Sequence, residues 1–232
     1  MSLPATQPER MAADPRRNCA GLLLAGGLGR RMGGGLKGMV LLARRPLLAH
    51  VVARASPQVA RLAVNANAPA VEFAPLGLPV LPDPVAGFAG PLAGVLAGMT
   101  WAREAGYGWV ASFPCDAPFF PEALVCDLAA EAGRADIVTA TSGGRRHPVF
   151  ALWATSLADD LHHALAEEGL RKVDRWTARH RVADVEFPIP PEGDPFFNIN
   201  TREDLAAAEA RLDSESSGGP AADHNDRPVS EI

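Results

Sequence analysis

Short apolar runs alternate along the chain with stretches in which apolar residues recur at helical spacing. Runs such as GLLLA and WVASF lack the apolar–polar alternation of a half-exposed strand and are typical of strands covered on both faces. The strands predicted from these runs are Cys19–Leu24, Arg61–Val64, Val80–Leu81, Trp109–Phe113, Asp136–Ala140 and Val149–Trp153. The helices predicted between them are Leu47–Ala55, Pro91–Glu104, Glu122–Ala132 and Leu157–Glu167. This alternation predicts a three-layer α/β/α fold around a mostly parallel sheet, with ligands at the carboxyl ends of the strands.

One further helix is predicted near the C-terminus. Thr201 is a suitable N-cap, and the acidic residues Glu203 and Asp204 would lie in the first turn, where they interact favourably with the helix dipole. The residues that would share the apolar face of this helix are Leu205, Ala208 and Leu212.

The two ends of the chain differ from the region between them. The first 18 residues show no apolar period, and the sequence after Leu212 is rich in Gly, Ser, Pro and Asp. Such segments bury too little apolar surface to offset the entropy that is lost on ordering. We therefore predict disordered tails over residues 1–18 and 213–232, which flank one domain over residues 19–212.

Composition and charge exclude several classes of protein. The 22 Lys and Arg against 27 Asp and Glu leave a net charge of −5, which argues against binding to nucleic acid or an anionic membrane through bulk charge. No apolar run approaches the roughly 18 residues of a membrane helix and no secretory signal is visible, so we expect a cytoplasmic protein. The three cysteines form no CxxC pair and the six histidines show no metal-binding spacing. Any phosphate site must therefore be built locally.

The segment Leu22–Gly38, LLLAGGLGRRMGGGLKG, starts as a buried strand and then supplies seven glycines and three cations. Glycines let backbone N–H groups approach a phosphate closely, and Arg30, Arg31 and Lys37 would neutralise its charge. The dinucleotide fingerprint GxGxxG fails because Met32 occupies its last glycine position, and the Walker A motif fails because no Ser or Thr follows the lysine. The segment predicts a phosphate site of another type, and the alternative is a glycine-rich surface loop without function.

A carboxylate follows the predicted strand Trp109–Phe113 in the sequence PCDAPF. Asp116 would therefore lie at the carboxyl edge of the sheet, where it could bind Mg²⁺, an ion that keeps several waters and bridges nucleotide phosphates. The alternative is that Asp116 only caps the helix that follows. Cys115 has no evident polarising partner, so we interpret it as a packing residue rather than a nucleophile.

Together these motifs resemble those of the molybdenum cofactor guanylyltransferases, and the resemblance covers the chain from about Gly21 to Leu212. Ten motifs in the family's order make the resemblance specific. They are LAGG at Leu24–Gly27, RRMGG at Arg30–Gly34, Lys37-Gly38, VNAN at Val64–Asn67, Pro-Asp at Asp83, GPLAG at Gly90–Gly94, PCDAPF at Pro114–Phe119, HPVFAL at His147–Leu152, RKV at Arg171–Val173, and FNINT with EDL through Leu205. The resemblance implies a Rossmann-like nucleotidyltransferase fold.

The resemblance also implies roles for particular residues. Those implied at the GTP site are Leu24, Ala25, Gly26, Lys37, Asn65, Asp83 and Asp116, with Asp116 also the Mg²⁺ ligand. Those implied at the molybdopterin site are Arg31, Gly34, Gly90, Gly94, Arg171, Lys172, Asn198 and Asn200. Those that would carry catalysis are Lys37, Asp116 and Arg31. Without the family context, the two asparagines could be turn residues and the Arg171–Lys172 pair solvated helix charges.

The implied reaction is transfer of GMP from GTP to the terminal phosphate of Mo-molybdopterin, with release of pyrophosphate. The nucleophile is already anionic, so catalysis requires positioning and charge neutralisation rather than a protein base. The alternatives are a molybdopterin cytidylyltransferase or other nucleotidyltransferase, and a non-catalytic carrier, which would be expected to have lost Asp116 or Lys37. The implied cofactor is Mg²⁺, and the implied partners include molybdopterin-carrying proteins and molybdoenzyme chaperones. We expect a monomer because no sustained heptads are present.

Two sites depart from the family pattern, and a histidine has no assigned role. Leu36 occupies a position where many members have an acidic residue, so the carboxylate partner of Lys37 is missing or comes from elsewhere. The sequence ARRP at residues 43–46 lacks the usual glycine turn, which predicts a somewhat different strand end. His147 precedes a proline, which favours an extended strand start, and we interpret it as a structural hydrogen-bonding residue rather than a general base.

Overall fold

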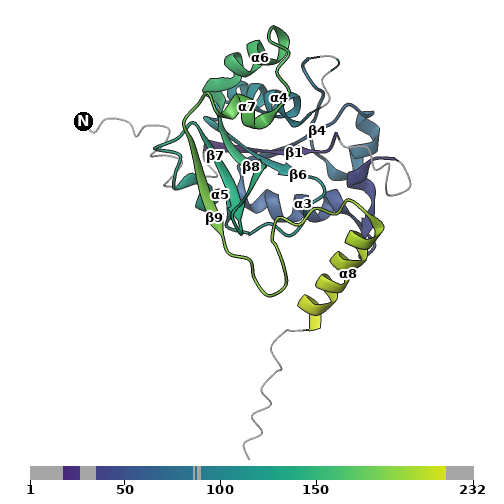
Figure 1. Cartoon of the computed structure of the whole chain (residues 1–232). Helices are drawn as coiled ribbons and strands as arrows, with labels where there is room; N and C mark the ends of the chain where they lie inside the picture. Colours follow the sequence, from purple (N-terminus) through teal and green to yellow (C-terminus); the bar gives the residue numbers. More distant parts are fainter. Residues whose placement is uncertain (1–17, 27–34, 86, 88–89, 218–232) are drawn as a thin grey trace, which may run out of the picture.

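A seven-stranded, mostly parallel sheet forms the centre of the molecule (Figure 1). The computed structural model describes residues 18–26, 35–85, 87 and 90–217. The strand order is β5-β4-β1-β6-β8-β7-β9, in which β8 runs antiparallel to both of its neighbours and the other pairings are parallel. The strands are β1 (Cys19–Leu24), β4 (Arg61–Asn65), β5 (Val80–Leu81), β6 (Trp109–Pro114), β7 (Ile137–Ser142), β8 (Arg145–Ala154) and β9 (Val182–Phe187).

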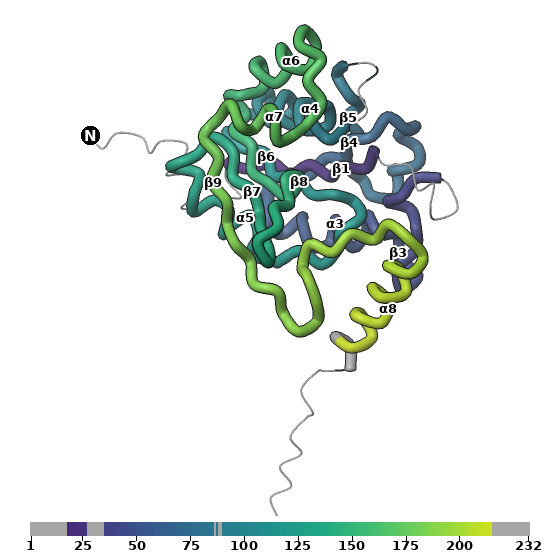
Figure 2. Tube along the Cα trace, viewed as in Figure 1, coloured from purple at the N-terminus to yellow at the C-terminus, as the bar shows by residue number. Residues whose placement is uncertain are grey.

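Helices cover both faces of the sheet (Figure 1, Figure 2). The helices on one face are α4 (Pro91–Glu104), α6 (Ala158–Ala166) and α7 (Val173–Thr177). Those on the other face are α3 (Leu47–Ala55) and α5 (Leu124–Ala129). Short 3-10 helices lie at Lys37–Met39, Ser56–Gln58, Ala70–Leu76 and Thr155–Leu157. This arrangement confirms the predicted three-layer α/β/α fold.

The core consists of one large apolar cluster on each side of the sheet. Side chains alternate between the faces of a strand, so Leu23 of β1 packs with α3 and α5 while Leu22 packs with α4 and α6. Both leucines are fully buried. Burial on two sides is the reason that the central strands read as continuous apolar runs rather than as alternating ones.

The last helix, α8 (Arg202–Ser217), lies outside the three layers and beside a small hairpin (Figure 2). The hairpin consists of β2 (Leu41–Leu42) and β3 (Arg45–Pro46), and Ala208 of α8 is buried in the apolar cluster that joins them. The other residues of that helix face are Leu205 and Leu212. The predicted apolar face of the last helix is therefore confirmed.

Several predicted boundaries need correction. Helix α8 continues to Ser217, so the prediction of a disordered tail from residue 213 is wrong over residues 213–217. Helix α5 is shorter than the predicted Glu122–Ala132, because turns replace helix at both ends. The other residues of the predicted tails, apart from Asn18, lie outside the described residues.

Three elements were missed because their sequence signals are weak. Helix α7 is only five residues long, too short to show a helical period, and β9 is a half-exposed edge strand. The β2–β3 hairpin turns through Ala43 and Arg44, whose φ angles are 47° and 64°. A two-residue hairpin turn with positive φ at both positions is typically built from Asn and Gly, so this sequence carries no turn signal. Residues 43–46 therefore differ from the family pattern in residue type, but they still form a hairpin turn.

Strand β8 begins four residues before the predicted start at Val149, and it contains a bulge. Between Thr139 and Ala140 of β7, the partner residue on β8 changes from Ala151 to His147. Pro148 lies in the skipped segment, where its missing N–H group costs no hydrogen bond of the sheet. The bulge explains how a proline is tolerated inside the sheet.

Helix α4 approaches the sheet closely through two glycines. A Cβ atom on Gly94 would lie 2.2 Å from Asn65 Oδ1, and one on Gly98 would lie 2.6 Å from Leu22 Cδ2. Atoms cannot approach this closely, so a larger residue at either position would require the Asn65 or Leu22 side chain, or the helix, to move. The glycines therefore let α4 lie close to β1 and β4.

The cysteines form no disulfide. Cys19, Cys115 and Cys126 are all free, and of these only Cys126 is exposed. Within the residues that the structure describes, no helix has both the length and the apolar character needed to cross a membrane.

Candidate active site

The carboxyl ends of β1, β4 and β6 meet at one edge of the sheet. Leu24, at the end of β1, pairs with Asn65 on one side and with Pro114 on the other. The Ala25 N–H group then donates to the Asn65 carbonyl at 2.9 Å, and the Cys115 N–H group donates to the Leu24 carbonyl at 3.2 Å. Three strands therefore direct the loops that follow them to one place, which is where open α/β sheets bind ligands.

Lys37, Asp116 and Asn200 form one cluster at this edge. The Lys37 ammonium forms an ion pair with the Asp116 carboxylate and donates a hydrogen bond to Asn200 Oδ1 at 2.6 Å. The Lys37 and Asp116 side chains are only 12% and 19% exposed, so water screens their attraction incompletely. Asp116 thus supplies the carboxylate partner that Leu36 cannot. It does not cap the following helix, whose N-cap is Ala123.

The start of helix α8 holds Asn200 in place. Asp204 Oδ2 accepts hydrogen bonds from the N–H groups of Asn200 and Thr201, each at 2.8 Å, and Thr201 Oγ1 accepts one from the Asp204 N–H group at 3.1 Å. This reciprocal arrangement is a capping box and confirms Thr201 as the N-cap. The hydrogen bond from the Asn200 N–H group is the main reason that the pKa of Asp204 is lowered. The Ile199 N–H group donates to the Asp116 carbonyl at 2.8 Å, which ties the two segments together.

A second polar cluster joins the ends of β4 and β5. The Asp83 carboxylate accepts hydrogen bonds from Asn65 Nδ2 at 2.9 Å and from Asn67 Nδ2 at 2.8 Å, and the Asp83 N–H group donates to Asn67 Oδ1 at 2.9 Å. Asn65 Nδ2 also donates to the Leu81 carbonyl at 3.1 Å. The sequence analysis assigned no role to Asn67. The available signal was the VNAN segment, in which a second asparagine follows the strand-end asparagine at a spacing of two.

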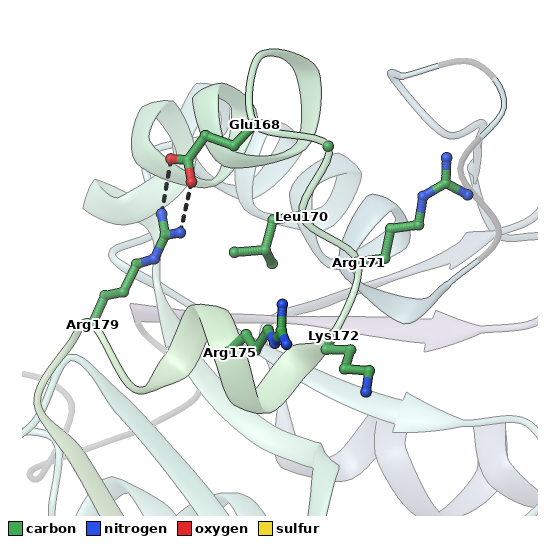
Figure 3. Close-up of a pocket in the computed structure, with 7 residues that line it drawn as sticks. Glu168, Leu170, Arg171, Lys172, Arg175 and Arg179 are labelled. Carbon is green, nitrogen blue, oxygen red and sulfur yellow. Dashed lines mark hydrogen bonds and ion pairs between the residues drawn. The ribbon is translucent and has the colours of Figure 1, made fainter.

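A basic pocket of about 520 Å³ lies where the chain passes from α6 to α7 (Figure 3). Its lining residues are Glu168, Gly169, Leu170, Arg171, Lys172, Arg175 and Arg179. The Glu168 carboxylate accepts hydrogen bonds from both terminal nitrogens of Arg179, at 2.8 and 2.6 Å. Arg171 and Lys172 precede α7 rather than lying within a helix, and Lys172 has extended backbone angles. The interpretation as helix charges is therefore wrong for this pair.

The basic pocket adjoins the N-terminus of α4. A Cβ atom on Gly90, the N-cap of α4, would lie 3.7 Å from the Arg171 carbonyl oxygen. Gly94 follows four residues later and lies against Asn65, the partner of Asp83. The first turn of α4 therefore connects the basic pocket to the Asp83 cluster.

The buried Ser142 and His147 and the half-buried Asp194 form a chain of hydrogen bonds. Ser142 Oγ donates to Asp194 Oδ1 at 3.0 Å, and a hydroxyl has only one proton, so His147 Nε2 donates to Ser142 Oγ at 2.7 Å. Asp194 Oδ1 also accepts from the Phe196 N–H group at 2.9 Å, and the His147 ring packs against Phe196 with its centroid at 4.6 Å. Burial lowers the pKa of His147, which keeps the imidazole neutral at pH 7. The predicted structural hydrogen bond of His147 is confirmed, and it fixes the segment that leads to Asn200.

Cys115 is not a nucleophile. Burial, with the neighbouring Asp116 charge as a smaller contribution, raises the pKa of the Cys115 thiol to about 12. Such a thiol is protonated at neutral pH and does not react readily. The interpretation of Cys115 as a packing residue is confirmed.

The strand edge fits a partly hydrated divalent cation. In the described part of the chain, no group of three or more His, Cys, Asp and Glu side chains is placed to hold a metal ion. A single carboxylate such as that of Asp116 is sufficient for Mg²⁺, because this ion keeps several waters and takes further ligands from substrate phosphates. A cation bound there would compete with Lys37 for the Asp116 carboxylate. The residues present therefore suit a site in which the metal replaces the Lys37 ammonium as the partner of Asp116.

The structure does not bring all predicted site residues together. Arg31 and Gly34 lie outside the described residues. Asn198 Nδ2 donates to the Phe196 carbonyl of its own segment at 3.4 Å, so its assignment to the molybdopterin site stays a prediction. Gly26, which follows the end of β1, is exposed and has space around it.

Comparison with known proteins places this chain in a family. Residues 21–182 match the MobA-like NTP transferase domain. Over 194 residues the chain is 54% identical to the molybdenum cofactor guanylyltransferase of Bradyrhizobium sp. strain ORS 278, which covers 82% of this chain and 91% of that relative. The chain belongs to the molybdenum cofactor guanylyltransferases. Membership makes it a nucleotidyltransferase of molybdenum cofactor biosynthesis and confirms the predicted family, enzyme class and function.

Solved structures agree with the guanylyltransferase fold. Molybdopterin-guanine dinucleotide biosynthesis protein A from Archaeoglobus fulgidus is 25% identical, with a TM-score of 0.65 over 84% of this chain and 99% of that chain. A Mycobacterium tuberculosis protein in complex with manganese is 15% identical, with a TM-score of 0.60 over 83% of this chain and 98% of that chain. The second similarity concerns the fold alone.

Proposed function

We propose that this chain transfers GMP from GTP to the terminal phosphate of Mo-molybdopterin, giving molybdopterin guanine dinucleotide and pyrophosphate. An oxygen of the acceptor phosphate forms a bond to the α-phosphorus of GTP, and the bond from that phosphorus to the β-phosphate oxygen breaks. The observation that carries the proposal is the contact of Lys37 with Asp116 and Asn200 at the carboxyl edge of the sheet, in a chain of this family.

The site supports a mechanism without a protein base. The acceptor phosphate is already anionic, so it needs alignment and charge neutralisation rather than deprotonation. Two side chains that were considered as nucleophile or base are unsuited to these roles, because the Cys115 thiol is protonated and His147 donates to Ser142. We therefore assign catalysis to Lys37, Asp116 and Arg31, of which Arg31 rests on the family resemblance.

The Lys37–Asp116 pair has two tasks in this proposal. A divalent metal is typical of the family, and we propose that Asp116 holds Mg²⁺, which neutralises charge on the GTP phosphates. With the Asp116 carboxylate engaged by the metal, the Lys37 ammonium would be available to donate to the phosphates, while its hydrogen bond to Asn200 would keep it at the strand edge. Lys37 then stabilises negative charge that develops on the transferred group.

The Asp83 cluster suits recognition of the nucleoside part of GTP. A carboxylate accepts two hydrogen bonds from adjacent N–H groups of guanine or from ribose hydroxyls. The amides of Asn65 and Asn67 orient this carboxylate before the nucleotide arrives. Leu24, Ala25 and Gly26, at the end of β1, are the remaining residues assigned to the proposed GTP site.

The molybdopterin site is proposed to lie along the start of α4 and the segment before α7. The residues assigned to it are Arg31, Gly34, Gly90, Gly94, Arg171, Lys172, Asn198 and Asn200. The proximity of Gly90 to the Arg171 carbonyl supports this grouping, because it brings together two segments that are 81 positions apart in the sequence. Arg171 and Lys172 provide the charge that a terminal phosphate requires.

Dinucleotide formation tests the proposal directly. The purified chain is incubated with Mo-molybdopterin, Mg²⁺ and either GTP or CTP, and the products are identified by mass spectrometry. We expect molybdopterin guanine dinucleotide and pyrophosphate from GTP alone. Product from CTP alone would keep the mechanism and replace the nucleotide, whereas product from neither would contradict the proposal and favour a carrier that binds without reacting. Parallel reactions with Mn²⁺ in place of Mg²⁺ test the choice of metal.

The proposal extends to the setting of the reaction. We place it in the cytoplasm and expect the chain to act as a monomer that receives its substrate from molybdopterin-carrying proteins and hands its product to molybdoenzyme chaperones. Sedimentation of the chain at several concentrations tests the monomer.

A further inference from the structure

The basic pocket contains a cation, Arg175, that the proposed function does not use. We propose that Arg175 binds the phosphate of the acceptor together with Lys172, and that the Glu168–Arg179 ion pair forms the wall of this subsite. The inference rests on the proposed function, which it deepens by assigning a further residue that determines acceptor affinity. The ligand class is a phosphate monoester dianion.

The charges of the pocket are unevenly compensated. Four cationic side chains and one carboxylate line it, in a protein whose overall net charge is −5. Glu168 holds Arg179 through two parallel hydrogen bonds, so that guanidinium is already matched by a carboxylate. In the described ranges, neither Lys172 nor Arg175 forms an ion pair with a carboxylate. These two cations are therefore available to an anionic ligand.

The arrangement of the side chains suits a phosphate rather than a single negative charge. In Figure 3, Lys172 and Arg175 lie on one side of Leu170, and the Glu168–Arg179 pair lies on another. The planar guanidinium of an arginine offers two parallel donors to phosphate oxygens, and a nearby ammonium adds a compact charge. The half-buried Leu170 offers apolar surface to the organic part of the ligand. A volume of about 520 Å³ is in the range of small-molecule sites.

Arg175 lies on helix α7, which the contacts of a buried tryptophan hold in place. Its neighbour Trp176 is fully buried, and the Trp176 indole Nε1–H group donates to Asp160 Oδ2 of α6 at 2.8 Å. The Trp176 ring also packs against Trp153 of the sheet, with centroids 6.0 Å apart. The backbone that carries Arg175 is therefore already fixed, and a ligand would order only the exposed side chain.

The pocket lies within reach of the nucleotide side of the site. Gly90 adjoins Arg171 and Gly94 adjoins Asn65, and four residues of helix rise by only about 6 Å. The terminal phosphate is the group that must reach the α-phosphorus of GTP, so we place it at the end of the pocket nearest this turn, with the rest of the acceptor directed away from the nucleotide.

Kinetics of Arg175 variants test the inference. We expect Arg175→Ala to raise the KM for Mo-molybdopterin about 10- to 100-fold, because a charged hydrogen bond to the phosphate is lost, and to leave the KM for GTP unchanged. Arg175→Lys should recover part of the loss, since charge without the planar fork restores only part of the contact. The matched control is Arg134→Ala, which removes an exposed arginine outside the pocket and should change neither KM. An unchanged acceptor KM in Arg175→Ala, or an equal rise in Arg134→Ala, would overturn the inference.

A binding measurement separates this inference from the proposed function. Inorganic phosphate is titrated into the isotope-labelled chain, and the indole N–H signal of Trp176 is followed by NMR. We expect the signal to shift with phosphate in the unmodified chain and in Arg134→Ala, and to lose that shift in Arg175→Ala. A failure to form dinucleotide from GTP would overturn the proposed function, yet this titration would still decide whether the pocket binds phosphate. An equal shift in Arg175→Ala would contradict the pocket even if the enzyme makes its product.

Discussion

The strand edge and the basic pocket differ in whether their charged side chains already have partners within the protein. At the strand edge, Lys37 pairs with Asp116, and the Asp83 carboxylate is held by two asparagine amides. In the pocket, Lys172 and Arg175 face a ligand site without a carboxylate partner among the described residues. A ligand at the edge must therefore displace hydrogen bonds and ion pairs that the protein makes with itself. A ligand in the pocket can bind the cations Lys172 and Arg175 directly.

The two regions also differ in how they are built. Parallel strands that are paired over their full length carry the edge, so its geometry depends on the buried sheet. A connecting segment and the five-residue helix α7 carry the pocket, and the buried Trp176 anchors them. The comparison suggests that changes at the edge alter catalysis most, while changes around the pocket alter acceptor affinity.

The largest expected effect comes from breaking the charge pair at the strand edge. Lys37→Ala should lower the turnover number about 100- to 1,000-fold, because a donor to the developing phosphate charge is lost. The free energy of unfolding should fall by only about 1–3 kcal/mol, because Asp116 loses its cation but its carboxylate keeps some contact with water. Turnover and thermal unfolding measured on the same samples check both parts.

Arg103→Ala is the control for Lys37→Ala. It removes an exposed ion pair with Asp159 that lies outside both regions, and it should leave turnover unchanged. Near-normal turnover in Lys37→Ala would contradict the catalytic role of this lysine.

The next effect compares the two glycines that link the regions. Gly94→Ala should lower the free energy of unfolding by about 1–3 kcal/mol and weaken GTP binding, because the new methyl group collides with the Asn65 side chain. Gly90→Ala should change stability by less than about 0.5 kcal/mol, because its Cβ would make only an ordinary contact with the Arg171 carbonyl. Denaturant unfolding and GTP titration measure both. Equal losses of stability in the two variants would show that the collision with Asn65 does not determine the cost of a methyl group at Gly94.

A smaller effect concerns the buried chain that fixes the segment leading to Asn200. Burial lowers the pKa of His147 below its ordinary value of 6.5, so the unfolded chain takes up a proton more readily than the folded one. The resulting stabilisation is complete above pH 6.5 and is lost as the pH falls through the folded pKa, by at most about 1.4 kcal/mol per pH unit. Unfolding measured between pH 7.5 and 5.5 should show a shallower fall for His147→Gln than for the unmodified chain. Identical slopes would exclude His147 as the source.

The smallest effect is expected at the β2–β3 hairpin. Ala43→Asn combined with Arg44→Gly should raise the free energy of unfolding by about 0.5–1 kcal/mol, because both positions have positive φ. Arg45→Gly, in the neighbouring strand, should lower it by a similar amount, because glycine loses more entropy in extended backbone. Chemical unfolding of the variants measures both. A destabilised double variant would mean that Ala43 and Arg44 make contacts that outweigh their backbone cost.

The sequence predicted best the parts that depend on local pattern. The bounds of β1, α3 and α4 agree with the predictions, because two-sided burial produces unbroken apolar runs and a covered helix produces a regular period. The N-cap Thr201 was likewise predicted, whereas the hydrogen bond from its N–H group to Asp204 became evident only in the structure. The sequence did not predict helix α7, strand β9 or the Ala43–Arg44 turn, because each is short or uses residues atypical of its conformation.

The sequence by itself determined the three-layer fold, the family and the identity of most residues at the strand edge, because each of these leaves a pattern within a short stretch of chain. Only the tertiary structure decided that Asp116 is the partner of Lys37, that Asn67 shares the Asp83 carboxylate, and that Arg175 joins Lys172 in one pocket. The first two contacts depend on which strand ends the sheet brings together. The third depends on where the buried Trp176 anchors α7, which no local pattern records.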